Sequence, residues 1–69
     1  MKKKYNPKIS IIMVVFNEEK TIIKSIQSIL SQNFKEYELL IFDNNSSDKT
    51  KYFLRKVSHN DGKVRVFYK

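Results

Sequence analysis

The sequence contains no cysteine and only one histidine, His59. Disulfide bonds, thiolate metal sites and a histidine metal cluster are therefore excluded, and any bound metal would need oxygen ligands. Glycine and proline occur once each, and there is no low-complexity tract. The composition favours an ordered globular piece over a disordered one. At 69 residues the chain is one small domain at most, and we expect its stability to be marginal.

The net charge is +7, from 14 Lys and Arg against 7 Asp and Glu. Clustered cations attract nucleic acids and anionic membranes, but Lys2, Lys3 and Lys4 form the only basic run. The other cations lie among acidic residues, as on a solvated surface. We therefore expect no nucleic-acid partner, with peripheral attraction to a membrane as the alternative.

The basic run and the apolar residues 9–16 together imitate a secretory signal peptide. No small-residue cleavage site follows them, and eight apolar-rich positions fall short of the ~20 residues that span a bilayer. We therefore predict a cytoplasmic protein, with the inner face of the membrane as an alternative location.

Residues 9–16 are rich in β-branched side chains and apolar on both alternating faces, which predicts a strand buried on both sides. Asn17 can cap a following helix, whose positive end Glu18 and Glu19 would suit. The apolar residues of this helix recur at helical spacing, and they are Ile22, Ile23, Ile26, Ile29 and Leu30.

Tyr37–Asp43 reads as a second strand, and residues 44–48 carry turn chemistry. Ser46 or Ser47 is the expected cap of a second helix. Residues 60–62 end that helix, and residues 63–68 alternate like a half-exposed edge strand. The residues of the second helix available for burial are Tyr52, Phe53, Leu54 and Val57.

This order of elements predicts an α/β fold, the right-handed βαβαβ half of a doubly wound, Rossmann-like parallel sheet with strand order 3-2-1. The first strand is the most apolar of the three, yet this order leaves it at an open edge. A further strand should pair with it, supplied by more chain or by a partner copy.

Ligands bind open parallel sheets beyond the carboxyl ends of the strands. Phe16, Asn17 and Glu18 leave the first strand, and Asp43 and Asn44 leave the second. A ring that stacks on a base, with two carboxylates and two amides for base and ribose groups, predicts a nucleoside site. The turn after the first strand has no glycines to cradle a pyrophosphate, so a dinucleotide cofactor is not favoured.

Each candidate also has a purely structural interpretation, and these alternatives stay open. Phe16 could be core, Asn17 only a cap, and Glu19 an answer to the helix dipole. Asp43 could bond to Ser46 within the turn. The lone histidine is best explained as a solvated loop residue.

The stretches ISIIMVVFNE, residues 9–18, and SIQSILSQNFKEYELLIFDNNSSDKT, residues 25–50, resemble the start of family 2 glycosyltransferases. That family opens with a strand ending in a Tyr-Asn-Glu-like turn and continues to Glu-Leu-Ile-x-x-Asp-Asp-Gly-Ser-x-Asp-x-Thr. The resemblance implies a GT-A fold and transfer of a sugar from a nucleotide diphosphate sugar to an acceptor hydroxyl, with Mg or Mn, in polysaccharide or glycoconjugate synthesis. The positions that match the nucleoside contacts are Val14, Phe16, Glu18, Asp43 and Asn44.

Three departures from the family pattern affect these contacts. Val14 stands where Pro or Thr is frequent, Phe16 replaces Tyr, and Asn44-Asn45 replaces Asp-Gly. The family's Asp-x-Asp metal motif and general base come later in the chain, so no catalytic or metal-binding residue is assigned here.

On this interpretation residues 1–8 are a basic lead and residues 9–69 a truncated nucleotide-binding subdomain. Without a metal and a base we expect no activity from the isolated chain. The alternative is a non-catalytic remnant or interaction module that self-associates through the exposed edge of its first strand.

Overall fold

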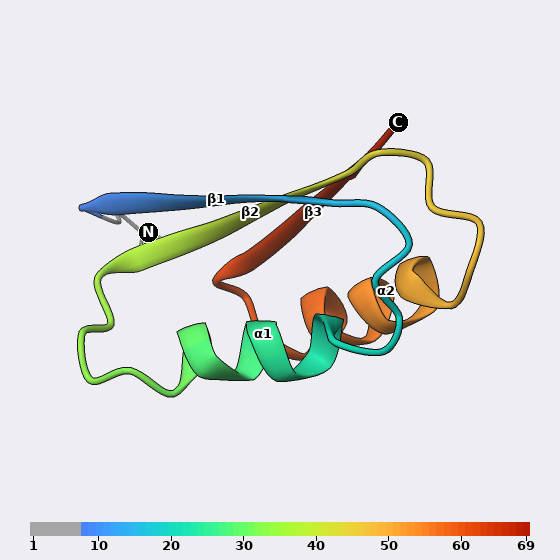
Figure 1. Cartoon of the computed structure of the whole chain (residues 1–69). Coiled ribbons are helices and arrows are strands. Elements are labelled where there is room, and N and C mark those ends of the chain that lie inside the picture. Colours follow the sequence, from blue (N-terminus) through green and yellow to red (C-terminus); the bar gives the residue numbers. More distant parts are fainter. Residues whose placement is uncertain (1–7) are drawn as a thin grey trace.

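The computed structural model describes residues 8–69, which form three strands and two helices in strict alternation (Figure 1). The predicted order of elements is confirmed. Lys2, Lys3 and Lys4 lie outside the described residues. The bounds are β1 Ile9–Val15, α1 Ile22–Leu30, β2 Tyr37–Asp43, α2 Thr50–Asn60 and β3 Val64–Tyr68.

The three strands form one parallel sheet in the order β1-β2-β3, which read from the other edge is the predicted 3-2-1. β2 is the central strand, and its Ile41 lies opposite Met13 of β1 and Val66 of β3. The α/β class and the βαβαβ arrangement are therefore confirmed. Within residues 8–69, β1 is an edge strand, as the order predicts.

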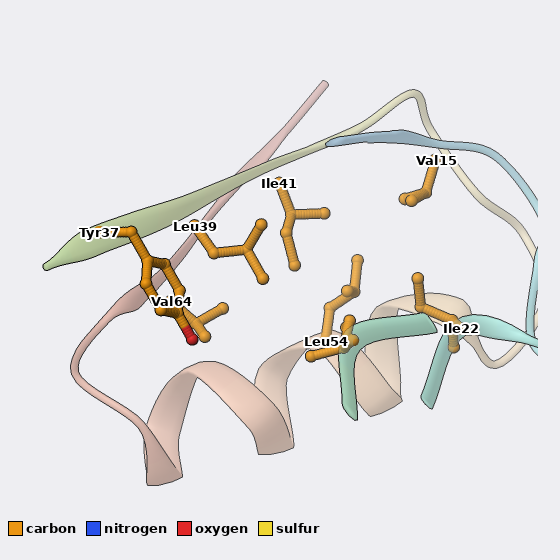
Figure 2. Packing of buried hydrophobic residues seen from close by; sticks show 8 residues of the cluster. Val15, Ile22, Tyr37, Leu39, Ile41, Leu54 and Val64 are labelled. Atoms are coloured by element: carbon orange, nitrogen blue, oxygen red, sulfur yellow. The ribbon is translucent and has the colours of Figure 1, made fainter. Parts of the chain in front are cut away.

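Both helices lie on the same face of the sheet (Figure 1). The space between the helices and the sheet is filled by the buried side chains of every element (Figure 2). Because β2 is central, alternate residues along it point into this core. The buried apolar residues are Val15, Ile22, Ile26, Tyr37, Leu39, Ile41, Leu54 and Val64.

Each helix turns one apolar stripe toward the sheet. In α1, Ile22 and Ile26 are fully buried, as the helical spacing predicts. In α2, Leu54 is fully buried while Phe53 packs against the core. Tyr52 is 53% exposed, so the prediction that it is buried is wrong. Tyr52 lies two residues before the buried Leu54, roughly 200° around the helix, so its side chain points away from the sheet.

The second face of the sheet has no helix over it in the described part of the chain (Figure 1). Ile12 and Val14 of β1 are 63% and 68% exposed, and Phe42 and Phe67 continue the exposed apolar surface across β2 and β3. The prediction that the first strand is buried on both sides is therefore wrong for residues 8–69. Both crossovers return over the same side of the sheet, so one side alone is covered.

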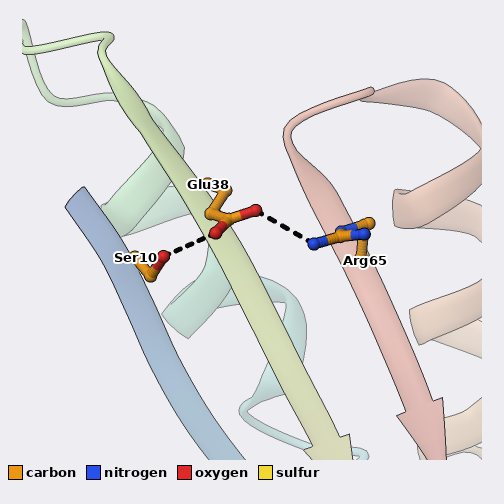
Figure 3. Close-up of polar contacts among 3 residues, drawn as sticks. All are labelled: Ser10, Glu38 and Arg65. Atoms are coloured by element: carbon orange, nitrogen blue, oxygen red, sulfur yellow. Dashed lines mark hydrogen bonds and ion pairs between the residues drawn. The ribbon is translucent and has the colours of Figure 1, made fainter. Parts of the chain in front are cut away.

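A polar group links the three strands near the amino end of this open face (Figure 3). Ser10 Oγ donates a hydrogen bond of 2.5 Å to Glu38 Oε2, and Arg65 Nη2 donates one of 3.1 Å to Glu38 Oε1. The Arg65 side chain is solvent-exposed, so this ion pair contributes little to stability.

Two predicted helix caps are wrong. α1 begins at Ile22 and its N-cap residue is Thr21, so Asn17 does not cap it. α2 begins at Thr50 and its N-cap residue is Lys49, so neither Ser46 nor Ser47 is its cap. The residues expected to cap their own helices instead join the two loops to each other, as described below.

We expect the same substitution to destabilise the protein much more on the covered face of the sheet than on the open face. Ile41→Ala removes a fully buried side chain and should cost about 2–5 kcal/mol, because it leaves a cavity under the sheet. Ile12→Ala, on the open face, should cost less than about 1 kcal/mol. Urea unfolding followed by circular dichroism measures both, and equal costs would contradict the one-sided core.

Candidate functional site

The loops that follow β1 and β2 lie together at the carboxyl edge of the sheet. The sheet hydrogen bonding continues into them, since the Asn44 amide donates to the Val15 carbonyl at 2.8 Å and the Lys69 amide to the Asp43 carbonyl at 3.0 Å. Parallel strands end at the same edge, so residues distant in sequence meet there. This edge is the candidate site.

The carboxyl group of Asp43 is buried at the end of β2, with 1% of the residue exposed. Ser46 Oγ donates to Asp43 Oδ1 at 2.5 Å, and the Ser46 amide donates to Oδ2 at 3.1 Å. The turn-bonding interpretation of Asp43 is thus realised. Each carboxylate oxygen can accept a second hydrogen bond, so these contacts do not by themselves exhaust its capacity.

Asn17 connects the first loop to the second. Its backbone N–H donates to Ser46 Oγ at 2.9 Å. Its side-chain Oδ1 accepts from the backbone N–H of Ser47 at 2.8 Å and, more weakly, from that of Asp48 at 3.4 Å. Asn17 has φ 48°, in the left-handed region that Asn tolerates better than most residues. The side chain is therefore a bridge between loops.

Glu18 and Glu19 extend this connection to the start of α2. The Glu18 amide donates to Thr50 Oγ1 at 2.8 Å. Glu19 Oε1 accepts from the Lys49 amide at 2.8 Å, so its carboxylate serves an unsatisfied amide at the positive end of α2. Glu19 therefore does lie at the positive end of a helix, as predicted, but this helix is α2 and not α1.

Asp48 lies where the two loops meet. Its Oδ1 accepts from the Thr50 amide at 2.8 Å and its Oδ2 from the Glu19 amide at 3.3 Å. Desolvation raises the pKa of Asp48, but hydrogen bonds from the Thr50 side chain and amide and from the Glu19 amide outweigh it. The net result is a pKa below the usual range of an aspartic acid.

Two hollows flank the joined loops. The first, of about 230 Å³, opens on the uncovered face of the sheet, where the rings of Phe42 and Phe67 stack with centroids 4.9 Å apart. It is lined by Val14, Phe42, Asp43, Asn44, Phe67, Tyr68 and Lys69. The second, of about 360 Å³, lies beside the loop that joins β1 to α1. It is lined by Asn17, Glu18, Glu19, Lys20, Thr21 and Asp48.

The structure divides the five residues predicted to contact a nucleoside. Val14, Asp43 and Asn44 line the first hollow, whereas Glu18 lines the second. Phe16 lines neither of these two hollows and is 55% exposed, so its interpretation as a core residue is wrong.

Phe67 and Tyr68 also line the first hollow, although the sequence patterns did not single them out. The signal was available, since the predicted parallel topology brings the end of β3 to the same edge. Burial raises the pKa of Tyr68; the Arg55 charge opposes this and the Asp43 charge adds to it. The phenol therefore stays protonated at neutral pH, and the Arg55 guanidinium of α2 lies 5.5 Å from the centre of its ring.

Oxygen ligands for a metal are not gathered in the described part of the chain. Among residues 8–69, no three His, Cys, Asp or Glu side chains lie close enough together to hold a metal ion. The residues present do not fit a divalent cation, and we derive no chemical step through one.

The profile of glycosyl transferase family 2 matches residues 10–69. The chain belongs to this family. It is 38% identical over 61 residues to the GalNAc(5)-diNAcBac-PP-undecaprenol beta-1,3-glucosyltransferase of Campylobacter jejuni, covering 88% of this chain and 20% of the relative. It is 40% identical over 58 residues to the Escherichia coli UDP-Glc:alpha-D-GlcNAc-diphosphoundecaprenol beta-1,3-glucosyltransferase WfgD, covering 84% of this chain and 22% of the relative. The chain thus spans about a fifth of the length of these relatives.

A solved structure shares the fold. The mannosyltransferase PcManGT from Pyrobaculum calidifontis, in complex with GDP-Man and Mn²⁺, matches 94% of this chain with a TM-score of 0.81 and 20% sequence identity, over 20% of its own length. The match supports the expected GT-A fold. Neither helix in residues 8–69 has the length and apolar character needed to cross a bilayer.

The bridge made by Asn17 can be tested by substitution. Asn17→Ala removes the bonds to the Ser47 and Asp48 amides and places alanine at φ 48°, so we expect a loss of about 1–3 kcal/mol. Asn17→Gly loses the bonds but relaxes the backbone, and should cost less. The control is the exposed Asn33→Ala, and urea unfolding is the measurement. A cost for Asn17→Ala no larger than the control's would refute the bridge.

The lowered pKa of Asp48 predicts a pH dependence. Because the folded pKa lies below the unfolded one, ionised Asp48 adds stability that is present above the unfolded pKa and is lost as the pH falls through the folded pKa. Asp48→Asn should therefore destabilise the chain most at neutral pH, and its difference from wild type in free energy of unfolding should shrink as the pH falls through the folded pKa. Unfolding curves across this range test it; a constant difference would show that the charge is not involved.

Proposed function

We propose that residues 9–69 form the nucleotide-binding part of a glycosyltransferase that transfers a sugar from a nucleotide diphosphate sugar to an acceptor hydroxyl. One observation carries the proposal: in a chain of family 2, Val14, Asp43 and Asn44 converge on one hollow at the carboxyl edge of a parallel sheet. Open α/β sheets bind their ligands at this edge.

The first hollow suits a nucleoside. Its apolar wall of Val14 and the stacked Phe42 and Phe67 rings offers contact area for a base. The exposed side-chain amide of Asn44 can both donate to and accept from base and ribose groups. The Asp43 carboxyl, which is 1% exposed, would accept from them only after a shift at the end of β2.

The remaining candidates would act at the margin of this site. Phe16, which is solvent-exposed, is free to stack on a base from the β1 side. Glu18 lies in the second hollow, from which its carboxylate would accept from ribose hydroxyls. Lys69 in the first hollow and Lys20 in the second would attract the diphosphate.

Sugar transfer by the 69-residue chain alone is not part of the proposal. The divalent metal expected for the family enzyme has no matching set of ligands among residues 8–69, and the chain spans about a fifth of its relatives. We propose that the chain by itself recognises the nucleotide without catalysing transfer.

The names of the relatives support a proposal for the acceptor class. The enzymes of C. jejuni and E. coli are named for acceptors linked to undecaprenol through a diphosphate. We propose that this chain serves glycoconjugate synthesis on a lipid-linked acceptor, on the cytoplasmic side and at the inner face of the membrane.

Self-association through β1 is a second candidate function. β1 is an edge strand with Ile9, Ile12 and Val14 exposed, so another strand could pair with its free side. Two copies joined in this way would form one continuous sheet. The mass in solution distinguishes a monomer from a dimer.

The nucleotide proposal predicts a localised response in the amide NMR spectrum of the chain. UDP and GDP, each added with Mg²⁺, should shift the amides of Val14, Asp43, Asn44 and Phe67, while the amides of α1 stay unmoved. Asn44→Ala, which removes an exposed side chain from the hollow, should weaken binding about three- to tenfold. Asn33→Ala is the matched control. Shifts scattered over the molecule, or none with either nucleotide, would refute the site.

A further inference from the structure

The outer side of α2 carries a row of exposed side chains that the nucleotide site does not use. They recur at helical spacing, so they lie on one side of the helix, and they line a shallow hollow of about 470 Å³. We call this surface the α2 face. It consists of Tyr52, Arg55, Lys56, His59 and Asn60.

The charge of the α2 face is unbalanced. The helix Thr50–Asn60 contains no acidic residue. The two ion pairs found among residues 8–69 are Lys8 with Glu36 and Arg65 with Glu38, and neither involves α2. Arg55 and Lys56 therefore present positive charge that no carboxylate in the described part of the chain neutralises.

The acidic residues on either side of α2 in sequence are engaged elsewhere. Asp48 accepts from the amides of Glu19 and Thr50. Asp61 Oδ1 accepts from the Lys63 amide at 2.9 Å. These carboxylates are held at the two ends of the helix, and the side between them is basic.

Aromatic rings hold the two cations along the helix surface. Lys56 Nζ lies 5.4 Å from the centre of the Tyr52 ring, and the Arg55 guanidinium lies 5.5 Å from the centre of the Tyr68 ring. Tyr52 is half exposed. An aromatic ring with a polar end, flanked by cations, is the chemistry that favours the boundary between water and lipid.

We propose that the α2 face docks on the surface of an anionic phospholipid bilayer. The apolar side of α2 is occupied by the core through Leu54, Phe53 and Val57, so the helix lies on the headgroups without inserting. Each Lys or Arg near an anionic surface strengthens binding about fivefold, so the contact is weak, reversible and sensitive to salt. A nucleic acid is less suitable, because the face offers one exposed ring and no row of aromatic platforms.

Docking in this way leaves the nucleotide site open. α2 lies on the helix side of the sheet (Figure 1), whereas Val14, Phe42 and Phe67 line the first hollow on the uncovered side. The inference rests on the proposed location at the inner face of the membrane, whereas nucleotide binding in the first hollow does not depend on it and is measured separately.

The test is co-sedimentation of the 69-residue chain with vesicles of phosphatidylglycerol and phosphatidylcholine, against vesicles of phosphatidylcholine alone. The double variant Arg55→Gln/Lys56→Gln should lower binding to the anionic vesicles about tenfold or more. The matched control, Lys20→Gln/Lys24→Gln, removes the same number of charges next to and within α1 and should lower binding less than about threefold. All forms keep Lys2, Lys3 and Lys4, so the comparison isolates the helix.

Equal losses in the two double variants would overturn the proposal, because binding would then follow net charge alone. Absence of binding to the anionic vesicles would overturn it as well. So would tighter binding to single-stranded RNA with the same dependence on Arg55 and Lys56, since the face would then belong to a different partner.

A second measurement does not depend on the variants. Vesicles carrying a nitroxide-labelled headgroup broaden the amide signals of residues that lie near the lipid surface. We expect the strongest broadening at Tyr52, Arg55 and His59, with Ile12 and Phe42 on the open sheet face unaffected. Broadening centred on the sheet face would assign the membrane contact to that face and refute the proposal.

Discussion

A carboxyl group buried at the end of a strand must find hydrogen-bond donors, and the site is organised around this need at Asp43. Ser46 satisfies it with both its hydroxyl and its amide, and the same hydroxyl accepts from the Asn17 amide. Asn17 in turn accepts from the Ser47 amide. The carboxyl edge is thus a connected polar network, in which the loop after β1 takes its position from the loop after β2.

The elements were largely predictable because the periodicity of their apolar residues is unambiguous. The bounds of β2 matched those predicted, since an apolar run ends sharply at Asp43. The predictions that were wrong concern which side of the sheet the helices cover. The pattern of residues 9–16 is that of a doubly covered strand, yet Val14 is exposed because α1 and α2 lie on one face. Alternation reveals two apolar faces but not which element will cover each.

The site was harder to predict than the fold because its side chains act between loops. Asn17, Ser46 and Glu19 have the chemistry of local caps, and a sequence assigns a cap to the nearest helix. In the structure Asn17 and Glu19 bond across a separation of about thirty residues, to amides before and at the start of α2. The positions around Asp43 could be predicted from the ends of the first two strands and from the family resemblance. Phe67 and Tyr68 lie at the end of β3, and predicting them requires that this third strand end be placed at the same edge of the sheet.

The central place of β2 has a consequence for the order in which the molecule opens. β2 is bonded to a neighbour along both sides, and its Leu39 and Ile41 are fully buried above the helices, while β1 and β3 each have one neighbour in residues 8–69. Detaching one outer strand frees only those β2 amides that bond to it, while the amides that bond to the other neighbour stay protected, so full exchange of β2 requires both ladders to open. The last protons to exchange with the solvent should be those of the strand that ends at Asp43, so the carboxyl group at the centre of the site is anchored to the slowest-opening part of the molecule.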